Sequence, residues 1–227
     1  MTVEDEAGLN RLGLIAAEYT PVDLTLREVE VDGILYTAPT AEQMEGFIFD
    51  LAHQINQSGA KFDRIVAIVR GGLTGARELM DLVEIPKVSP VRYERYTGTN
   101  QTQELKLVQP LTESVWGETD LLYDEVVDKG DTIAAAKKYI GEMGAKVRTA
   151  ALGYKPTQSQ VEPDFYAFTT TAWIVFPHER HEFIKENAAK WKAKGMSIVE
   201  AAQRLITIGI PFNYIDDFLG NAWASGE

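Results

Sequence analysis

Hydrophobic positions along the chain are grouped in two ways, as short continuous runs and as stretches rich in helix formers. Apolar, β-branched runs occupy residues 64–69 and 147–154, and a third apolar run begins at Leu121. Such runs are typical of strands that are buried on both faces of a sheet. Helix-like stretches follow at residues 76–83 and 133–143. This alternation predicts an α/β fold with a mainly parallel sheet and helices on both faces.

The beginning of the chain predicts a β-hairpin followed by a helix. Asp32-Gly33 lies between short alternating segments, and this dipeptide favours a tight hairpin turn. Thr40, with Gln43 three residues later, has the pattern of a helix N-cap with a capping box. Ser58-Gly59 marks the predicted end of that helix.

The end of the chain becomes helical after Pro177. Short helices are predicted at residues 182–193, 198–206 and 214–219, separated by glycines and a proline. This segment carries no motif that indicates chemistry. Two interpretations stay open, because such helices can cover an edge of the sheet or form an interface between subunits.

The chain therefore divides into three predicted parts. Residues 1–38 form an N-terminal extension with the hairpin, residues 39–181 form the α/β domain, and residues 182–227 form a helical C-terminal extension. We expect a small hood beside the main sheet, as well as the helical tail.

Composition limits the classes of function. The chain has 227 residues, of which 45% are hydrophobic, enough for one sizeable α/β domain with an appendage. It carries 22 Lys and Arg against 34 Asp and Glu, and the net charge of -12 argues against a nucleic-acid partner. There is no cysteine, which excludes disulfides, thiolate zinc sites and a cysteine nucleophile. Without a signal-like segment or a membrane-length apolar run, we expect a cytoplasmic protein with no membrane partner.

One segment combines a strand, a polar loop and the start of a helix. It reads Leu121-Leu122-Tyr123-Asp124-Glu125-Val126-Val127-Asp128-Lys129-Gly130-Asp131-Thr132. Backbone N–H groups at such a helix start can hold a phosphate, and acids at a strand end can hold sugar hydroxyls or a metal. The alternative is an ordinary strand-to-helix turn, in which the acids cap the helix and the glycine serves only geometry.

The order of residues in this segment resembles the phosphoribosyl-pyrophosphate (PRPP) signature of the type I phosphoribosyltransferases. That signature has an apolar strand, two acids, two apolar residues and Asp-Thr-Gly-x-Thr. Lys129 stands where the family has its first Thr, and Glu125 is an accepted second acid. The resemblance implies that residues 128–132 bind the 5′-phosphate of PRPP: Asp128, Lys129, Gly130, Asp131 and Thr132.

A second motif, Arg70-Gly71-Gly72, follows the buried run at residues 64–69. Glycines let backbone amides approach an anion closely, although a simple tight turn is the alternative. In type I phosphoribosyltransferases, a loop at this place in the chain binds pyrophosphate, and the resemblance implies that role for Arg70, Gly71 and Gly72.

The polar stretch at residues 94–104 is predicted to be a mobile loop after a strand at residues 85–93. It resembles the flexible loop of the xanthine-guanine phosphoribosyltransferases, including Asn-Gln and a following Glu-Leu-Lys. The family resemblance implies a lid over the reacting centre, which would exclude water. The lid residues are Tyr96, Thr97, Gly98, Thr99 and Asn100. A surface excursion without function is the alternative.

Two further positions resemble the base-binding residues of the same family. Lys155 ends a strand, and the resemblance implies that it donates to the 6-oxo group of a purine; a solvated strand-end lysine is the alternative. Trp173 and Ile174 match the segment in which an aromatic side chain stacks on the base. His178 stands where a second Trp is usual. With no evident carboxylate partners for His178 and His181, a metal role for the histidines is not indicated.

The resemblance implies a phosphoribosyltransferase that transfers ribose 5-phosphate from PRPP to N9 of a 6-oxopurine. Its catalytic residues would be Asp128, Asp124 and Glu125. Asp124 and Glu125 hold the ribose hydroxyls and, through them or through water, Mg²⁺. Asp128 hydrogen-bonds to N7 of the base. The partners are PRPP and a purine base, and we expect a homo-oligomer, either a dimer or a tetramer.

Two other functions remain open at this stage. One is a PRPP-binding regulator without catalysis, although no basic DNA-binding element accompanies the motifs. The other is a phosphoribosyltransferase for another nucleobase, against which Lys155 and Trp173 argue. The sequence does not rank guanine, xanthine and hypoxanthine.

Overall fold

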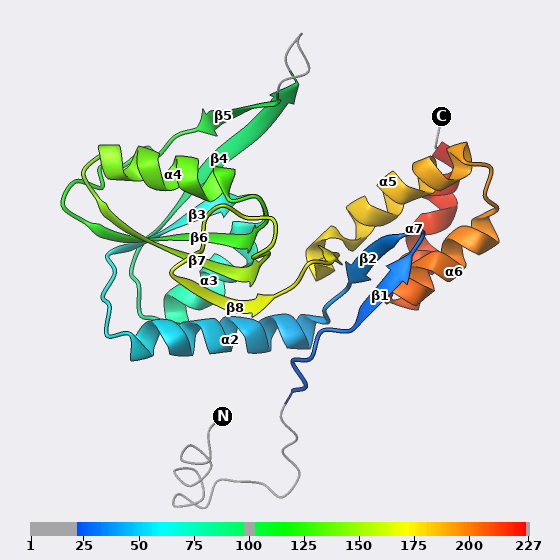
Figure 1. The fold of residues 1–227 in the computed structure, drawn as a ribbon, viewed down its shortest axis with the longest axis horizontal. Coiled ribbons are helices and arrows are strands. Elements are labelled where there is room, and N and C mark those ends of the chain that lie inside the picture. The colour runs from blue at the N-terminus through cyan, green and yellow to red at the C-terminus, as the bar shows by residue number, and fades with distance from the viewer. Residues whose placement is uncertain (1–21, 98–102, 226–227) are drawn as a thin grey trace, which may run out of the picture.

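The computed structural model describes residues 22–97 and 103–225. In Figure 1, the large sheet and the helices that pack on it lie on the left, and a smaller, mainly helical body lies on the right. None of the helices in the described part of the chain has the length and apolar character that a bilayer crossing requires.

The main sheet has six strands in the order β5-β4-β3-β6-β7-β8. Their bounds are Arg64–Val69 (β3), Val88–Thr97 (β4), Gln103–Gln109 (β5), Thr119–Val127 (β6), Lys146–Tyr154 (β7) and Phe165–Thr169 (β8). All neighbouring pairs are parallel except β4 and β5, which pair antiparallel at one edge. The carboxyl ends of β3, β6 and β7 therefore lie along the same edge of the sheet.

Helices cover both faces of this sheet, as the sequence predicted. Helices α2 (Ala41–Gln57) and α3 (Gly72–Leu82) pack on one face, where Leu51, Leu79 and Tyr123 share a buried cluster. Helix α4 (Asp131–Glu142) packs on the other face, where Ile133 and Ile140 meet apolar residues of the central strands. Each of these helices precedes or follows a strand of the parallel sheet, so the alternation in the sequence places them in layers on the two faces of the sheet.

Local sequence signals explain two of the predicted elements. Thr40 caps α2, and Thr40 and Gln43 form the reciprocal side-chain and backbone bonds of a capping box. Asp32 and Gly33 have φ angles of 51° and 78°, the left-handed pair that a tight hairpin turn requires. Strands β1 (Glu28–Val31) and β2 (Ile34–Thr37) form that hairpin.

The smaller body, which we call the hood, joins the hairpin to the end of the chain. It consists of β1, β2, β9 (Trp173–Ile174), α5 (Arg180–Ala193), α6 (Ile198–Ile208) and α7 (Phe212–Ser225). Strand β2 pairs in parallel with β9, so Tyr36 lies opposite Trp173. A separate hydrophobic core, which includes Tyr36, Ile184 and Leu205, holds the hairpin against the helices. A short 3₁₀ helix, η1 (Pro177–Glu179), connects β9 to α5.

Three sequence-based predictions need correction. Much of the predicted loop at residues 94–104 is strand: Glu94–Thr97 of β4 pairs with Gln103–Lys106 of β5. Its polar composition reflects a hairpin with much of its surface exposed, which needs no alternation of apolar residues. Helix α3 begins at Gly72 rather than at residue 76, and β6 continues to Val127, so that Asp124 and Glu125 lie within the strand.

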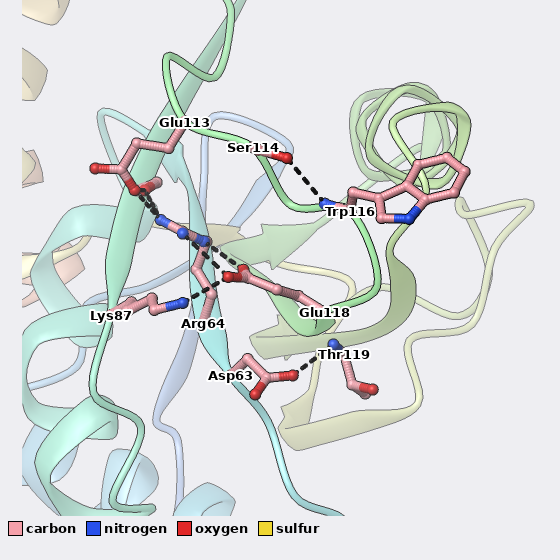
Figure 2. Close-up of polar contacts among 9 residues, drawn as sticks. Asp63, Arg64, Lys87, Glu113, Ser114, Trp116, Glu118 and Thr119 are labelled. Carbon is pink, nitrogen blue, oxygen red and sulfur yellow. Dashed lines mark hydrogen bonds and ion pairs between the residues drawn. The ribbon is translucent and has the colours of Figure 1, made fainter.

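A charged cluster lies at the other end of the strands, where β3, β4 and β6 begin (Figure 2). Arg64 is buried and binds Glu113 and Glu118, and Glu118 also binds Lys87. Asp120, on the neighbouring strand, is fully buried, and both of its carboxylate oxygens have no hydrogen-bond partner among the described residues. Burial raises the pKa of Asp120 to about 6, with a further contribution from Glu118.

Candidate active site

The motifs predicted from the sequence come together at the carboxyl edge of the main sheet. The turn at residues 70–72 follows β3, the acids end β6, and Lys155 directly follows β7. Because β6 lies between β3 and β7, the acids occupy the centre of this edge. Ligands of open α/β sheets bind beyond the carboxyl ends of the strands, where these residues lie.

The turn after β3 packs directly on an acid of β6. A Cβ atom added to Gly71 would lie 1.7 Å from Oε1 of Glu125, so no larger residue fits without displacing that carboxylate. Gly71 is the N-cap of α3, and the first amides of a helix have no intrahelical acceptor. The arrangement therefore brings helix N–H groups, which can hold an anion, next to a carboxylate.

The Arg70 side chain takes a different direction. Its guanidinium donates to Glu182 of α5, with nitrogen–oxygen distances of 2.9 and 3.2 Å, and both side chains are exposed. The side chain thus joins the main domain to the hood in this structure, while Gly71 and Gly72 form the turn into α3, whose role in binding an anion stays a prediction.

The loop between β6 and α4 turns at a glycine beside a cavity. Gly130 has a φ of 85°, and a Cβ atom at this position would lie 2.6 Å from Oγ of Ser159, so the loop requires glycine. A cavity of about 220 Å³ opens over the loop. Its lining includes all five predicted phosphate-binding residues: Asp128, Lys129, Gly130, Asp131 and Thr132.

The two acids at the end of β6 are largely shielded from solvent. Burial raises the pKa of Asp124 well above its ordinary value, and the adjacent Glu125 carboxylate raises it further. Glu125 is 9% exposed. Positive charge brought next to an ionised carboxylate at this position would be stabilised.

A second cavity, of about 200 Å³, brings together the residues predicted to bind the base. Lys155 and Asp128 lie side by side in its lining, with 3.5 Å between Nζ and Oδ2. Lys155 is only 6% exposed, which excludes the solvated strand-end alternative. Oδ1 of Asp128 is buried and has no hydrogen-bond partner in the described part of the chain. Trp173 and Ile174 line the same cavity, and Trp173 is half exposed.

His178 was misjudged from the sequence, because it does have carboxylate partners. Its Nε2 lies 2.9 Å from Oε2 of Glu125, and this contact raises the pKa of His178 above its ordinary value. Glu179 is close as well, and ligand atoms of the three side chains lie within 4.8 Å of one another. Burial, with the nearby Glu125 carboxylate, raises the pKa of Glu179 to about 7. In the sequence, the adjacent His178 and Glu179 after the predicted base-binding segment were the signal that could have indicated this cluster.

The Mg²⁺ that the resemblance implies fits this chemistry. Glu125 and Glu179 lie within reach of one another, and with Asp124, which neighbours Glu125 on β6, they would supply the carboxylate oxygens that Mg²⁺ prefers. The imidazole of His178 adds a ligand that transition metals accept more readily than Mg²⁺ does.

The predicted lid is only partly within the described residues. Tyr96 and Thr97 end strand β4, whereas Gly98, Thr99 and Asn100 lie outside the described residues. The lid role therefore stays a prediction.

Comparison with known proteins identifies the family that this site belongs to. The model of the phosphoribosyl transferase domain matches residues 40–181, which is more than half of the chain. The chain therefore belongs to the phosphoribosyltransferase family. The predicted resemblance to a type I enzyme close to the xanthine-guanine and hypoxanthine phosphoribosyltransferases is confirmed, as is the prediction of an enzyme.

Individual relatives agree with this assignment. The chain is 30% identical to the xanthine-guanine phosphoribosyltransferase of Idiomarina loihiensis over 53% of this chain and 73% of the relative. It is 31% identical to the enzyme of the same name from Gluconobacter oxydans, over 63% and 83% of the two chains. The crystal structure of a purine phosphoribosyltransferase from Pyrococcus horikoshii superposes with a TM-score of 0.58 at 28% identity, covering 63% of this chain and 93% of that one.

Proposed function

We propose that the protein transfers the 5-phosphoribosyl group of PRPP to N9 of a 6-oxopurine and releases pyrophosphate. Guanine, xanthine and hypoxanthine are the candidate bases. Two of the relatives are named for xanthine and guanine and the third for purines, and the residues of the site offer a group for each part of the two substrates.

The ion pair between the buried Lys155 and the half-exposed Asp128 is the observation that carries this proposal. A lysine ammonium can only donate hydrogen bonds, whereas an ionised aspartate can only accept them. O6 and N7 of a 6-oxopurine lie on one edge of the base. Lys155 would donate to O6, while Asp128 would accept from a protonated N7 and hold that proton during transfer. Adenine would place its amino donor against the ammonium, so the pair selects against it.

The sugar and its leaving group would lie over the acids of β6. Asp124 and Glu125 would accept hydrogen bonds from the ribose hydroxyls, and their negative field would stabilise the cationic sugar in the transition state. The amides of Gly71 and Gly72 would hold the pyrophosphate, and residues 128–132 would hold the 5′-phosphate. Trp173 would cover one face of the base, a contact worth roughly 1–3 kcal/mol.

Bound Mg²⁺ would neutralise the pyrophosphate and so make it a better leaving group. Asp124 and Glu125 would hold it through ribose hydroxyls or water, and Glu179 is a further oxygen ligand. PRPP and a purine are thus the proposed partners, while the homo-oligomer and the cytoplasmic location stay predictions.

A turnover screen tests the proposal. The purified protein would be incubated with PRPP, Mg²⁺ and one base at a time: guanine, xanthine, hypoxanthine, adenine, uracil or orotate. We expect pyrophosphate release and a nucleoside monophosphate with at least one 6-oxopurine, and much slower turnover with adenine and the pyrimidines. Turnover with a pyrimidine alone would refute the base assignment. PRPP binding without turnover of any base would refute catalysis and favour the regulator.

A further inference from the structure

Arg95 is a charged residue that the sequence did not place in the site. It lies on β4, three strands away from β7, yet its side chain reaches the cavity over the β6–α4 loop. The cavity lining otherwise consists of residues from the end of β6, the following loop and the start of α4. Arg95 therefore brings a guanidinium from another part of the sheet to the place where we put the 5′-phosphate.

The guanidinium is held there by an acid of the loop itself. One of its terminal nitrogens donates to Asp131, the first residue of α4, and this contact is the largest cause of the lowered pKa of Asp131. An ionised Asp131 beside a phosphate dianion would repel it. Arg95 removes that repulsion by neutralising Asp131. A guanidinium has five N–H donors, so it can hold a carboxylate and donate to a phosphate as well.

We propose that Arg95 is a phosphate-binding residue of this enzyme, positioned by Asp131 to contact the 5′-phosphate of PRPP and of the product nucleotide. The inference rests on the proposed function, because it assumes that a ribose 5-phosphate occupies this cavity. Lys129, which replaces a Thr of the family pattern, lies in the same lining. The loop carries two acids, Asp128 and Asp131. Arg95 and Lys129 supply the positive charge that the binding of a dianion needs there.

The test compares ligands that differ only in the phosphate. Binding of GMP and of guanosine would be measured by calorimetry for the parent, for Arg95→Gln and for Arg92→Gln. Arg92 is a matched control, because it lies on the same strand, pairs with Glu94 and does not line the cavity. We expect Arg95→Gln to weaken GMP binding about tenfold to a hundredfold, the loss of a charged hydrogen bond, and to leave guanosine within twofold. Arg92→Gln should change neither. In turnover assays, the KM for PRPP should rise while the KM for the base stays constant.

A second pair of variants separates phosphate binding from a purely structural role. If Arg95 only holds Asp131 in place, Asp131→Asn would weaken GMP binding as much as Arg95→Gln, and the double variant would be no worse. Under the proposal, Asp131→Asn removes only the contact that positions Arg95, so it weakens GMP binding less than Arg95→Gln does, and adding Arg95→Gln then weakens it further. Parent-like GMP binding by Arg95→Gln, or equal weakening of GMP and guanosine, would overturn the inference. A parent that binds neither PRPP nor GMP would instead refute the proposed function.

Discussion

Lys155→Gln is the change that most directly tests how the base is selected. The substitution removes the charge of a side chain that is 6% exposed and lies 3.5 Å from Asp128. It keeps a hydrogen-bonding side chain in the cavity, although one bond shorter. Because glutamine can both donate and accept, it tolerates the 6-oxo group of guanine and the 6-amino group of adenine alike.

The magnitude follows from the contact that is lost. A hydrogen bond from a charged donor contributes roughly 1.5–3 kcal/mol, which is about a tenfold to hundredfold change in kcat/KM for a 6-oxopurine. Adenine gains rather than loses, since the ammonium no longer faces its amino group. The ratio of kcat/KM for guanine to that for adenine should therefore fall by at least this factor.

The assay is a competition between guanine and adenine at equal concentration, with PRPP and Mg²⁺ present and both nucleotides measured. Lys146→Gln is the matched control, because Lys146 is the exposed first residue of the same strand, at the opposite end from the site. Thermal unfolding of each variant checks that the buried substitution leaves the protein folded. An unchanged preference in a folded Lys155→Gln protein would remove Lys155 from base recognition and refute the argument for a 6-oxopurine.

Three other changes test separate parts of the structure. Asp128→Asn should keep the affinity for PRPP but lower kcat about 10²–10⁴-fold, because the amide cannot manage the N7 proton; calorimetry with PRPP and steady-state turnover measure the two effects, and parent-like turnover would exclude this role. Asp120→Asn should raise the Tm at pH 8. Folding raises the pKa of the Asp120 carboxyl from 3.8 to about 6, so the folded protein loses stability as the pH rises from about 4 to above 6, by about 3 kcal/mol in total, and the asparagine avoids this loss. That gain should shrink below pH 6 and vanish by about pH 4, and an equal gain at both pH values would contradict it. His178→Asn should weaken Mn²⁺ binding more than Mg²⁺ binding, and the parent's Mn²⁺ affinity should fall as Glu179, with a pKa of about 7, takes up a proton at lower pH. Calorimetry with each metal at pH 6 and pH 8 measures this, and a pH-independent affinity would count against the cluster as a ligand set.

Much of the fold followed from local signals in the sequence. The buried strands β3 and β7 are continuous apolar runs, and the capping box at Thr40 and the turn at Asp32 were explicit. The glycine turn and the acids each follow an apolar strand in the sequence, which also predicts that they share one edge of the sheet, because parallel strands align their carboxyl ends.

Contacts between distant parts of the chain could not be predicted in this way. His178 meets Glu125 across 53 positions, Arg95 meets Asp131 across 36, and each pair depends on how two elements pack. The periodicity of apolar residues along the chain does not predict such a pairing. The polar end of β4 and the whole of β5 were missed for a related reason, since exposed residues at the edge of a sheet need no apolar alternation.

The pairing of β2 with β9 bears on the order in which the protein is assembled. Trp173 lies on a strand whose neighbour, β2, comes from near the start of the described chain, and the core that holds β2 is completed by α6 and α7 near its end. During synthesis, about 170 residues must therefore be added after the hairpin before its hydrophobic face can be covered. The phosphate and pyrophosphate loops belong to the main sheet and need no such wait. The aromatic wall of the base cavity should thus be the last part of the site to become ordered as the nascent chain folds.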